Sequence, residues 1–161
     1  MAKVSIDLSG FNRKLEKLRR LQNASRKRDL ELPFLAAGIY KGAKIAADEE
    51  RRYIESIPRH VRNEPGGIND FERAAMLEGL GISPMRYYGD ELNVRVGFDG
   101  YYEGPTGRRE PIPKIVRSVS SGTTWMQKKY PVARIVTRRV KREVVEVIQR
   151  EVEEQIDRML K

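Results

Sequence analysis

The chain has 161 residues, of which 39% are hydrophobic and 34% are charged, and its formal net charge is +9. This composition fits one domain with a modest apolar core and a heavily charged surface. The absence of cysteine excludes disulfides, thiolate nucleophiles and thiolate metal sites, and no run of about 18 apolar residues is present that could cross a bilayer.

The excess positive charge is concentrated in the N-terminal segment. Residues 1–28 hold nine Lys or Arg against two Asp or Glu, whereas the remaining residues hold 23 against 21. This segment lacks an apolar signal core, so export by that route is not expected. Apolar residues at helical spacing predict a short helix. Its opposite face is basic and consists of Arg13, Lys14, Lys17 and Arg20. We therefore divide the chain into a basic arm, residues 1–28, and a single domain, residues 29–161.

A basic arm attracts anions, but its charge alone does not identify the partner. Nucleic acid, acidic lipid and an acidic protein face would all be attracted to it. An arm that is simply solvated and aids solubility is an equally open interpretation.

A long helix is predicted over about residues 32–57. Its apolar residues recur at helical spacing, and Pro58 ends the pattern. Gly38 and Gly42 would let another backbone approach this helix closely. Residues 59–70 contain Glu-Pro-Gly-Gly and are predicted to form an exposed loop. A short helix is expected near residues 69–76.

The second half of the chain combines a hairpin with two helices. Residues 78–98 alternate between apolar and polar positions and predict a β-hairpin, in which Pro84 indicates an edge strand or an early break of the first strand. We expect a loop at residues 99–111 and a short helix from Pro113 that ends near Gly122. A final helix is predicted over about residues 131–160. Within it, Glu146–Arg150 and Glu154–Arg158 have the spacing of favourable ion pairs.

These elements predict an α+β fold. A small antiparallel sheet should pack against the long helix of the N-terminal half and the long C-terminal helix. The basic arm precedes this domain.

No catalytic, metal-binding or cofactor-binding residue is predicted. His60 is the only histidine and falls in an expected loop, without a partner pattern for nucleophilic catalysis. Asp48, Glu49 and Glu50 are adjacent on the long helix, where consecutive side chains point in different directions, so we interpret them as a solvated charged face. The glycine-rich segments lack the spacing of phosphate-binding loops. We therefore expect the chain to act by assembly and not by catalysis.

Basic and aromatic residues occur together in two segments beyond the arm. This combination is enriched at protein interfaces and is also found where proteins bind single-stranded nucleic acid. We favour the protein interface, and a basic nucleic-acid-binding protein is the alternative. Besides the four basic residues of the arm, the candidate contact residues are Arg108, Arg109, Trp125, Lys128 and Lys129.

Three motifs in a fixed order resemble a known family. Asn-Val-Arg-Val-Gly-Phe-Asp-Gly-Tyr at residues 93–101 follows the Ala-rich long helix. Ile-Val-Arg-Ser-Val-Ser-Ser-Gly-Thr-Thr occupies residues 115–124, and Lys-Tyr-Pro-Val at residues 129–132 opens the last helix. Over about residues 34–150 the chain resembles the gene-product-ten-like tail-component family of tailed phages, also called tail-completion or head–tail joining proteins. The Pro-x-x-Thr-Gly-x-Leu-x-x-Ser stretch of many members is absent after Pro58.

The resemblance implies a structural virion protein of the phage neck, made in the bacterial host cytoplasm. It implies a homo-oligomeric ring, with a hexamer favoured, between the portal or adaptor connector and the tail-tube protein. Genomic DNA would pass through the lumen and touch basic side chains without sequence-specific contacts. The resemblance implies no catalytic residue, cofactor or membrane.

Overall fold

The computed structural model describes residues 31–62, 66–88, 91–104, 107–122 and 129–159. The predicted arm, residues 1–28, lies outside these ranges. The helices are α2 (Glu31–Ser56), α3 (Asp70–Gly79), α4 (Ile112–Ser121) and α5 (Val132–Met159). The strands are β1 (Leu80–Ile82), β2 (Arg86–Tyr88), β3 (Glu91–Asn93), β4 (Val96–Phe98), β5 (Tyr101–Glu103) and β6 (Arg109–Pro111). The predicted α+β class is confirmed, with the described strands paired into three two-stranded antiparallel sheets.

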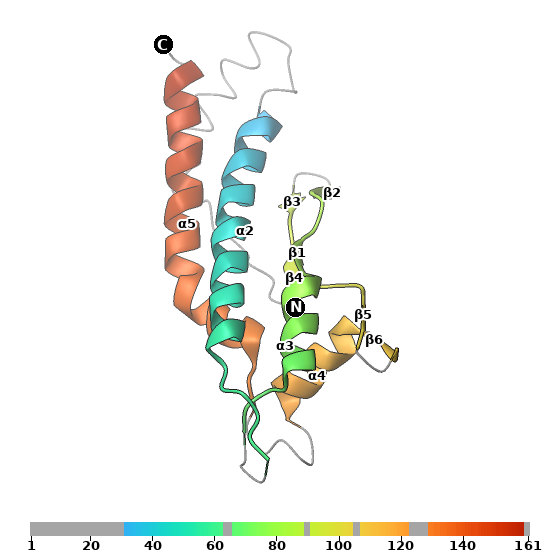
Figure 1. The fold of residues 1–161 in the computed structure, drawn as a ribbon. Coiled ribbons are helices and arrows are strands. Elements are labelled where there is room, and N and C mark those ends of the chain that lie inside the picture. The colour runs from blue at the N-terminus through green and yellow to red at the C-terminus, as the bar shows by residue number, and fades with distance from the viewer. Residues whose placement is uncertain (1–30, 63–65, 89–90, 105–106, 123–128, 160–161) are drawn as a thin grey trace.

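Helices α2 and α5 lie side by side and run in opposite directions (Figure 1). The predicted close approach at the glycines of α2 is confirmed. A Cβ atom on Gly42 would lie 2.7 Å from Cδ1 of Ile148, and one on Gly38 would lie 3.2 Å from the backbone oxygen of Ile148. The two helices therefore meet where α2 has no side chains to hold them apart.

The buried apolar residues of α5 recur at every fourth position. They are Val132, Val136, Val140, Val144, Ile148, Val152 and Ile156. Four residues exceed one helical turn by about 40°, so this stripe winds around the helix instead of following one side. Its middle part, Val144 to Val152, lies against Gly38 and Gly42 of α2. The first part of the stripe belongs to the core shared with Tyr130 and the residues of α3 and α4.

The predicted hairpin at residues 78–98 is present but divided into two short ladders. Strand β1 pairs with β4 in the register Leu80↔Phe98, and β2 pairs with β3 in the register Arg86↔Asn93. Between the ladders, the Ser83 amide donates to the Arg95 carbonyl at 2.8 Å and the Arg95 amide donates to Ser83 Oγ at 2.9 Å. The break follows directly at Pro84, which confirms the predicted early interruption of the first strand.

The expectation of a loop throughout residues 99–111 is wrong. Strands β5 and β6 form a second hairpin there, with Tyr101 opposite Pro111 and Glu103 opposite Arg109. Its strands are too short for an alternating pattern to be recognised. The hairpin is fixed instead by packing on a distant element, because the Tyr102 ring meets the Phe71 ring of α3 edge-on at 5.0 Å.

The ends of the short helices follow from local chemistry. Asn69 caps α3: its Oδ1 accepts from the Glu72 amide at 2.7 Å, and the Glu72 carboxylate accepts from the Asn69 amide at 2.9 Å. Pro113 lies in the first turn of α4, and Gly122 follows its last turn with a φ of 75°. Both features of α4 agree with the prediction. Among the described residues no helix is long and apolar enough to span a membrane.

Candidate interaction surfaces

The segment after α2 is closed at its base by backbone hydrogen bonds. The His60 amide donates to the Ile68 carbonyl at 3.0 Å, and the Ile68 amide donates to the Pro58 carbonyl at 2.9 Å. Gly67 has a φ of +79°, and a Cβ there would lie 2.6 Å from the Arg59 backbone, so this position requires glycine. The Tyr130 hydroxyl accepts from the Gly67 amide at 2.8 Å, which ties the base of the loop to the start of α5.

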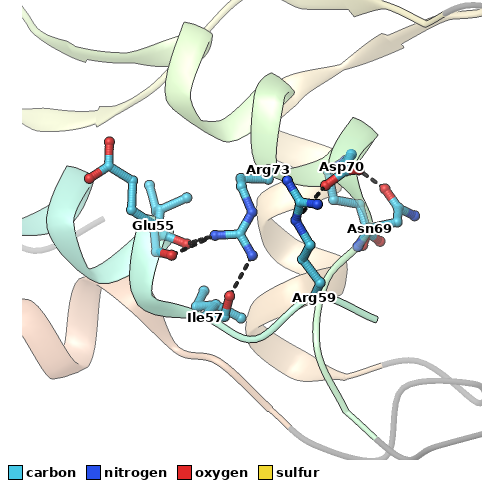
Figure 2. Close-up of polar contacts among 8 residues, drawn as sticks. Glu55, Ile57, Arg59, Asn69, Asp70 and Arg73 are labelled. Carbon is cyan, nitrogen blue, oxygen red and sulfur yellow. Dashed lines mark hydrogen bonds and ion pairs between the residues drawn. The ribbon is translucent and has the colours of Figure 1, made fainter. Parts of the chain in front are cut away.

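Arg73 of α3 holds the end of α2 in place, as Figure 2 shows. Its guanidinium donates to the carbonyl oxygens of Ile54 at 2.7 Å and Glu55 at 2.8 Å, and also to that of Ile57. The last carbonyls of a helix have no partner within the helix, and a cation near them is favoured by the helix dipole. Arg73 therefore sets the direction in which the chain leaves α2.

The described residues of the loop 58–70 present polar and apolar groups to solvent. Arg59 forms an ion pair with Asp70 at 3.3 Å (Figure 2), and the Val61 side chain is exposed, with 50% of its residue surface accessible. His60 Nδ1 lies 3.2 Å from the Gly66 carbonyl oxygen, so the histidine takes part in the loop's internal bonding. Exposed apolar and charged groups on a fixed base make this loop a candidate contact surface.

The hairpin β5–β6 has one face against α3 and the other face in solvent. Tyr102 packs on Phe71, and a Cβ on Gly104 would lie 2.6 Å from the same Phe71 ring. On the opposite face, Tyr101 is 57% exposed and the Arg109 guanidinium lies 4.8 Å from the centre of its ring. An exposed tyrosine stacked with an arginine is a combination enriched at protein interfaces.

The predicted contact residues are only partly brought together. Arg108 and Arg109 lie in or beside β6 and are exposed, and Arg108 pairs with Glu110 at 2.8 Å. Lys129 is also exposed but lies beyond the C-terminal end of α4, whereas β6 directly precedes α4. The other candidates lie outside the described residues: Arg13, Lys14, Lys17, Arg20, Trp125 and Lys128.

The acidic triplet of α2 is not the solvated face that the sequence indicated. Asp48 is exposed, whereas Glu49 is partly buried and pairs with Arg139 at 3.2 Å and with Arg52 at 3.3 Å. Glu50 is buried, with only 4% of its surface exposed. Burial raises the pKa of its carboxyl from 4.5 to about 7, because a charged carboxylate is poorly solvated there. Helical spacing alone could have revealed that Glu50 is buried, because its side of α2 also holds the apolar residues Ala46, Ala47, Ile54 and Ile57.

The surface of α5 carries a further group of basic residues, which the sequence shows as a cluster at residues 134–142. Arg139 is engaged within the chain, with Glu49 and with the Tyr53 ring at 5.3 Å. Arg142 pairs with Glu146 at 2.8 Å, so the predicted pairing of Glu146 with Arg150 is replaced by one with Arg142. The predicted pair of Glu154 and Arg158 is present at 3.9 Å.

The arrangement contains surfaces suited to binding macromolecules. Within the described ranges, no group of three or more His, Asp or Glu side chains is placed to hold a metal ion. No protein-family model, curated protein or solved structure matches the chain.

Proposed function

We propose that this chain is a structural protein of a tailed phage that joins the head connector to the tail. It would act as a neck or tail-completion component in a homo-oligomeric ring, with a hexamer favoured. The observation that carries the proposal is the order of its elements: a long helix, a short helix, an interrupted hairpin, a second hairpin, another short helix and a second long helix. Within this order, the three resembling motifs follow the first long helix and lead into the last helix, as the resemblance implies.

The three resembling motifs lie at the junctions between these elements. Residues 93–101 run from the end of β3 through β4 to the start of β5, and residues 115–122 complete α4. Tyr130 of the third motif bonds to Gly67 and precedes α5. The motifs thus contain residues that position elements, and this supports a shared fold more than a shared chemical site.

The proposed mechanism is docking through surfaces held on a rigid frame. The loop at residues 58–70 and the hairpin β5–β6 each have an anchored base, and each exposes an apolar side chain, Val61 in the loop and Tyr101 in the hairpin. Interfaces gain most of their binding free energy from a few rigid aromatic and arginine side chains. Tyr101 and Arg109 have this character and would contact the connector or the tail-tube protein.

The proposal is tested with the connector and tail-tube proteins of the phage to which it assigns this chain. Purified chain should bind at least one of them in a complex of fixed stoichiometry, measured by size-exclusion chromatography with light scattering. Phage lacking the gene should accumulate separate heads and tails in electron micrographs. Binding to neither protein, together with normal virions from the deletion, would refute the joining role.

A basic nucleic-acid-binding protein is the second candidate. It is favoured by exposed basic residues on α5 that have no ion pair with a residue of the described ranges, namely Arg134, Arg138 and Lys141. This function predicts a strongly salt-dependent affinity for duplex DNA by the monomer, because binding releases counterions. Loss of that affinity on removal of residues 1–28 would point to the arm as its main site.

A further inference from the structure

Charge is segregated along α5 in a way that the helix itself does not favour. Residues 132–142 contain five basic side chains and no acidic one, whereas residues 143–159 contain six acidic and two basic side chains. The positive end of a helix dipole is at its N-terminus, yet Arg134 lies in the first turn and Asp157 in the last. Only Arg158, a cation in the last turn, has the sign of charge that the helix dipole favours at that end. The segregation therefore requires a reason outside the helix.

Contacts within the chain account for part of this charge. Glu49 of α2 pairs with Arg139, and Lys41 of α2 pairs with Glu151. These two ion pairs lie along the contact between the antiparallel helices α2 and α5. Arg142 pairs with Glu146 and Arg158 with Glu154 on the exposed surface of α5.

Three basic side chains form what we name the basic patch: Arg134, Arg138 and Lys141. All three are exposed, and none has an ion pair or hydrogen bond to any residue of the described chain. Their spacing of four and three residues places them on neighbouring turns, over about 10 Å of helix. Such a row fits a row of carboxylates on a partner.

The opposite end of α5 carries what we name the acidic patch: Glu153, Glu154 and Asp157. The three side chains are exposed and lie within about one and a half turns. Glu154 reaches Arg158 only at 3.9 Å, and that pair is itself exposed. The centres of the two patches are about 25 Å apart along a single helix, so they cannot meet within one copy.

We propose that the basic patch of one copy of this chain binds the acidic patch of a second copy. The inference rests on the proposed function and names the contact through which its copies would meet. Two different patches make a head-to-tail contact, which repeats around a ring when the rotation closes. A nucleic acid would use the basic patch alone and would leave the matching acidic patch unexplained. Exposed ion pairs are weak and screened by salt, so the contact should weaken as ionic strength rises.

The first test reverses the charge of the basic patch. Arg134→Glu combined with Arg138→Glu should weaken self-association at least ~10-fold in sedimentation velocity at low salt, since like charges then face each other. The matched control is Lys44→Glu with Arg51→Glu, two exposed residues of α2 that give the same change in net charge. The control should associate like the unchanged protein. Equal weakening of both variants, or an unchanged protein that is monomeric at every concentration, would overturn the proposal.

The second test restores the contact from two defective variants. Glu154→Arg combined with Asp157→Arg should also fail to associate alone. An equimolar mixture with the Arg134→Glu, Arg138→Glu variant should associate again, because the reversed patches complement each other. Recovery in the mixture requires both variants to be folded, so it separates the contact from misfolding. No recovery in a mixture of variants that keep the helical circular dichroism of the unchanged protein would overturn the proposal.

Binding to labelled duplex DNA gives the competing outcome. The basic-patch variant should keep the affinity of the unchanged protein for the duplex. If this variant loses its affinity for the duplex but still self-associates like the unchanged protein, the proposal is overturned. The basic patch would then be a binding site for a polyanion. The joining role is decided separately: it survives if the connector or tail-tube protein still binds while the charge reversals have no effect, and it fails if self-association is intact but neither protein binds.

Discussion

The helix pair α2–α5 and the segment between the two helices, residues 58–122, share one apolar core but differ in the further contacts that position them. The pair is held by apolar packing, with Ile148 seated over the glycines of α2. The intervening segment depends on side chains that bond to backbone groups, such as Arg73 at the end of α2 and the Tyr130 hydroxyl at Gly67. Packing along a helix tolerates some adjustment, whereas each of these polar contacts joins particular atoms.

This difference indicates a division of roles between the two regions. The helix pair provides a rigid frame whose surface displays charge, and the intervening segment presents short exposed elements on anchored bases. Substitutions in the frame should change stability most. Substitutions on the exposed elements should change binding most, and the predictions below follow that order.

The largest loss of stability is expected from Gly42→Leu. A Cβ added at this position would lie only 2.7 Å from Ile148 and 3.0 Å from Val144. A leucine side chain must therefore push the helices apart. Overpacking of this kind costs about 3 kcal/mol in the free energy of unfolding, which urea denaturation measures. Lys44→Leu, at an exposed position of the same helix, is the control.

A double mutant sharpens this test. Adding Ile148→Ala to Gly42→Leu should recover part of the loss, because the smaller side chain makes room for the leucine. Additive losses would instead show that the helices do not touch at these residues.

Glu50→Gln should raise stability at neutral and alkaline pH. The folded-state pKa of about 7 lies above the ordinary value of 4.5, so the folded chain holds the proton more tightly than the unfolded chain. The stability from this group is complete below pH 4.5 and is lost as the pH rises through 7, by up to about 3 kcal/mol. The glutamine variant lacks this loss, so the difference in unfolding free energy should grow between pH 4.5 and 8.5.

The exposed Glu55 on the same helix is the control for this pH dependence. Glu55→Gln should follow the unchanged protein at both pH values. An identical pH dependence for Glu50→Gln and the unchanged protein would mean that the Glu50 carboxylate is well solvated in the fold.

Arg73→Met tests the junction between the two regions. The methionine fills a similar volume but leaves the carbonyls of Ile54, Glu55 and Ile57 without their donor. The expected loss is about 2 kcal/mol in the free energy of unfolding, as for other buried groups deprived of a partner. Arg51→Met at an exposed site is the control, and equal effects at both positions would contradict the role of Arg73.

The smallest effect on stability is expected from Tyr101→Ser on the hairpin β5–β6. Tyr101 is exposed and contacts Arg109. The free energy of unfolding, measured by thermal denaturation, should therefore change by no more than about 0.5 kcal/mol. Affinity for the connector or tail-tube protein should fall at least ~10-fold if this face is a contact. The Tyr102→Ser control should instead destabilise the fold, since Tyr102 packs on Phe71.

Periodic features of the sequence predicted the elements that depend on periodicity. The apolar spacing placed both long helices, and Pro58, Pro84 and Gly122 marked ends and breaks that the structure contains. Strands β5 and β6 were missed because three residues carry no recognisable alternation. Their pairing depends on Phe71, which is some thirty residues earlier in the chain.

The candidate surfaces were less predictable than the fold. The sequence singled out Arg108 and Arg109, which are exposed, but gave no sign that Tyr101 stacks on Arg109. It also placed Glu50 among solvated acids, because three adjacent acids resemble a charged surface unless each is assigned to its own side of the helix. The sequence shows five basic residues in the first part of α5. The structure pairs two of them, Arg139 and Arg142, with acidic residues, and only this pairing distinguishes them from the three residues of the basic patch.

The central claim is that this chain works by assembling with copies of itself and with neighbouring virion proteins. Sedimentation velocity over a wide concentration range, alone and with the connector and tail-tube proteins, tests it most directly. We predict a concentration-dependent and salt-sensitive oligomer that forms a complex of fixed stoichiometry with at least one of the two proteins. A species that stays monomeric at every concentration and binds neither protein would contradict the claim.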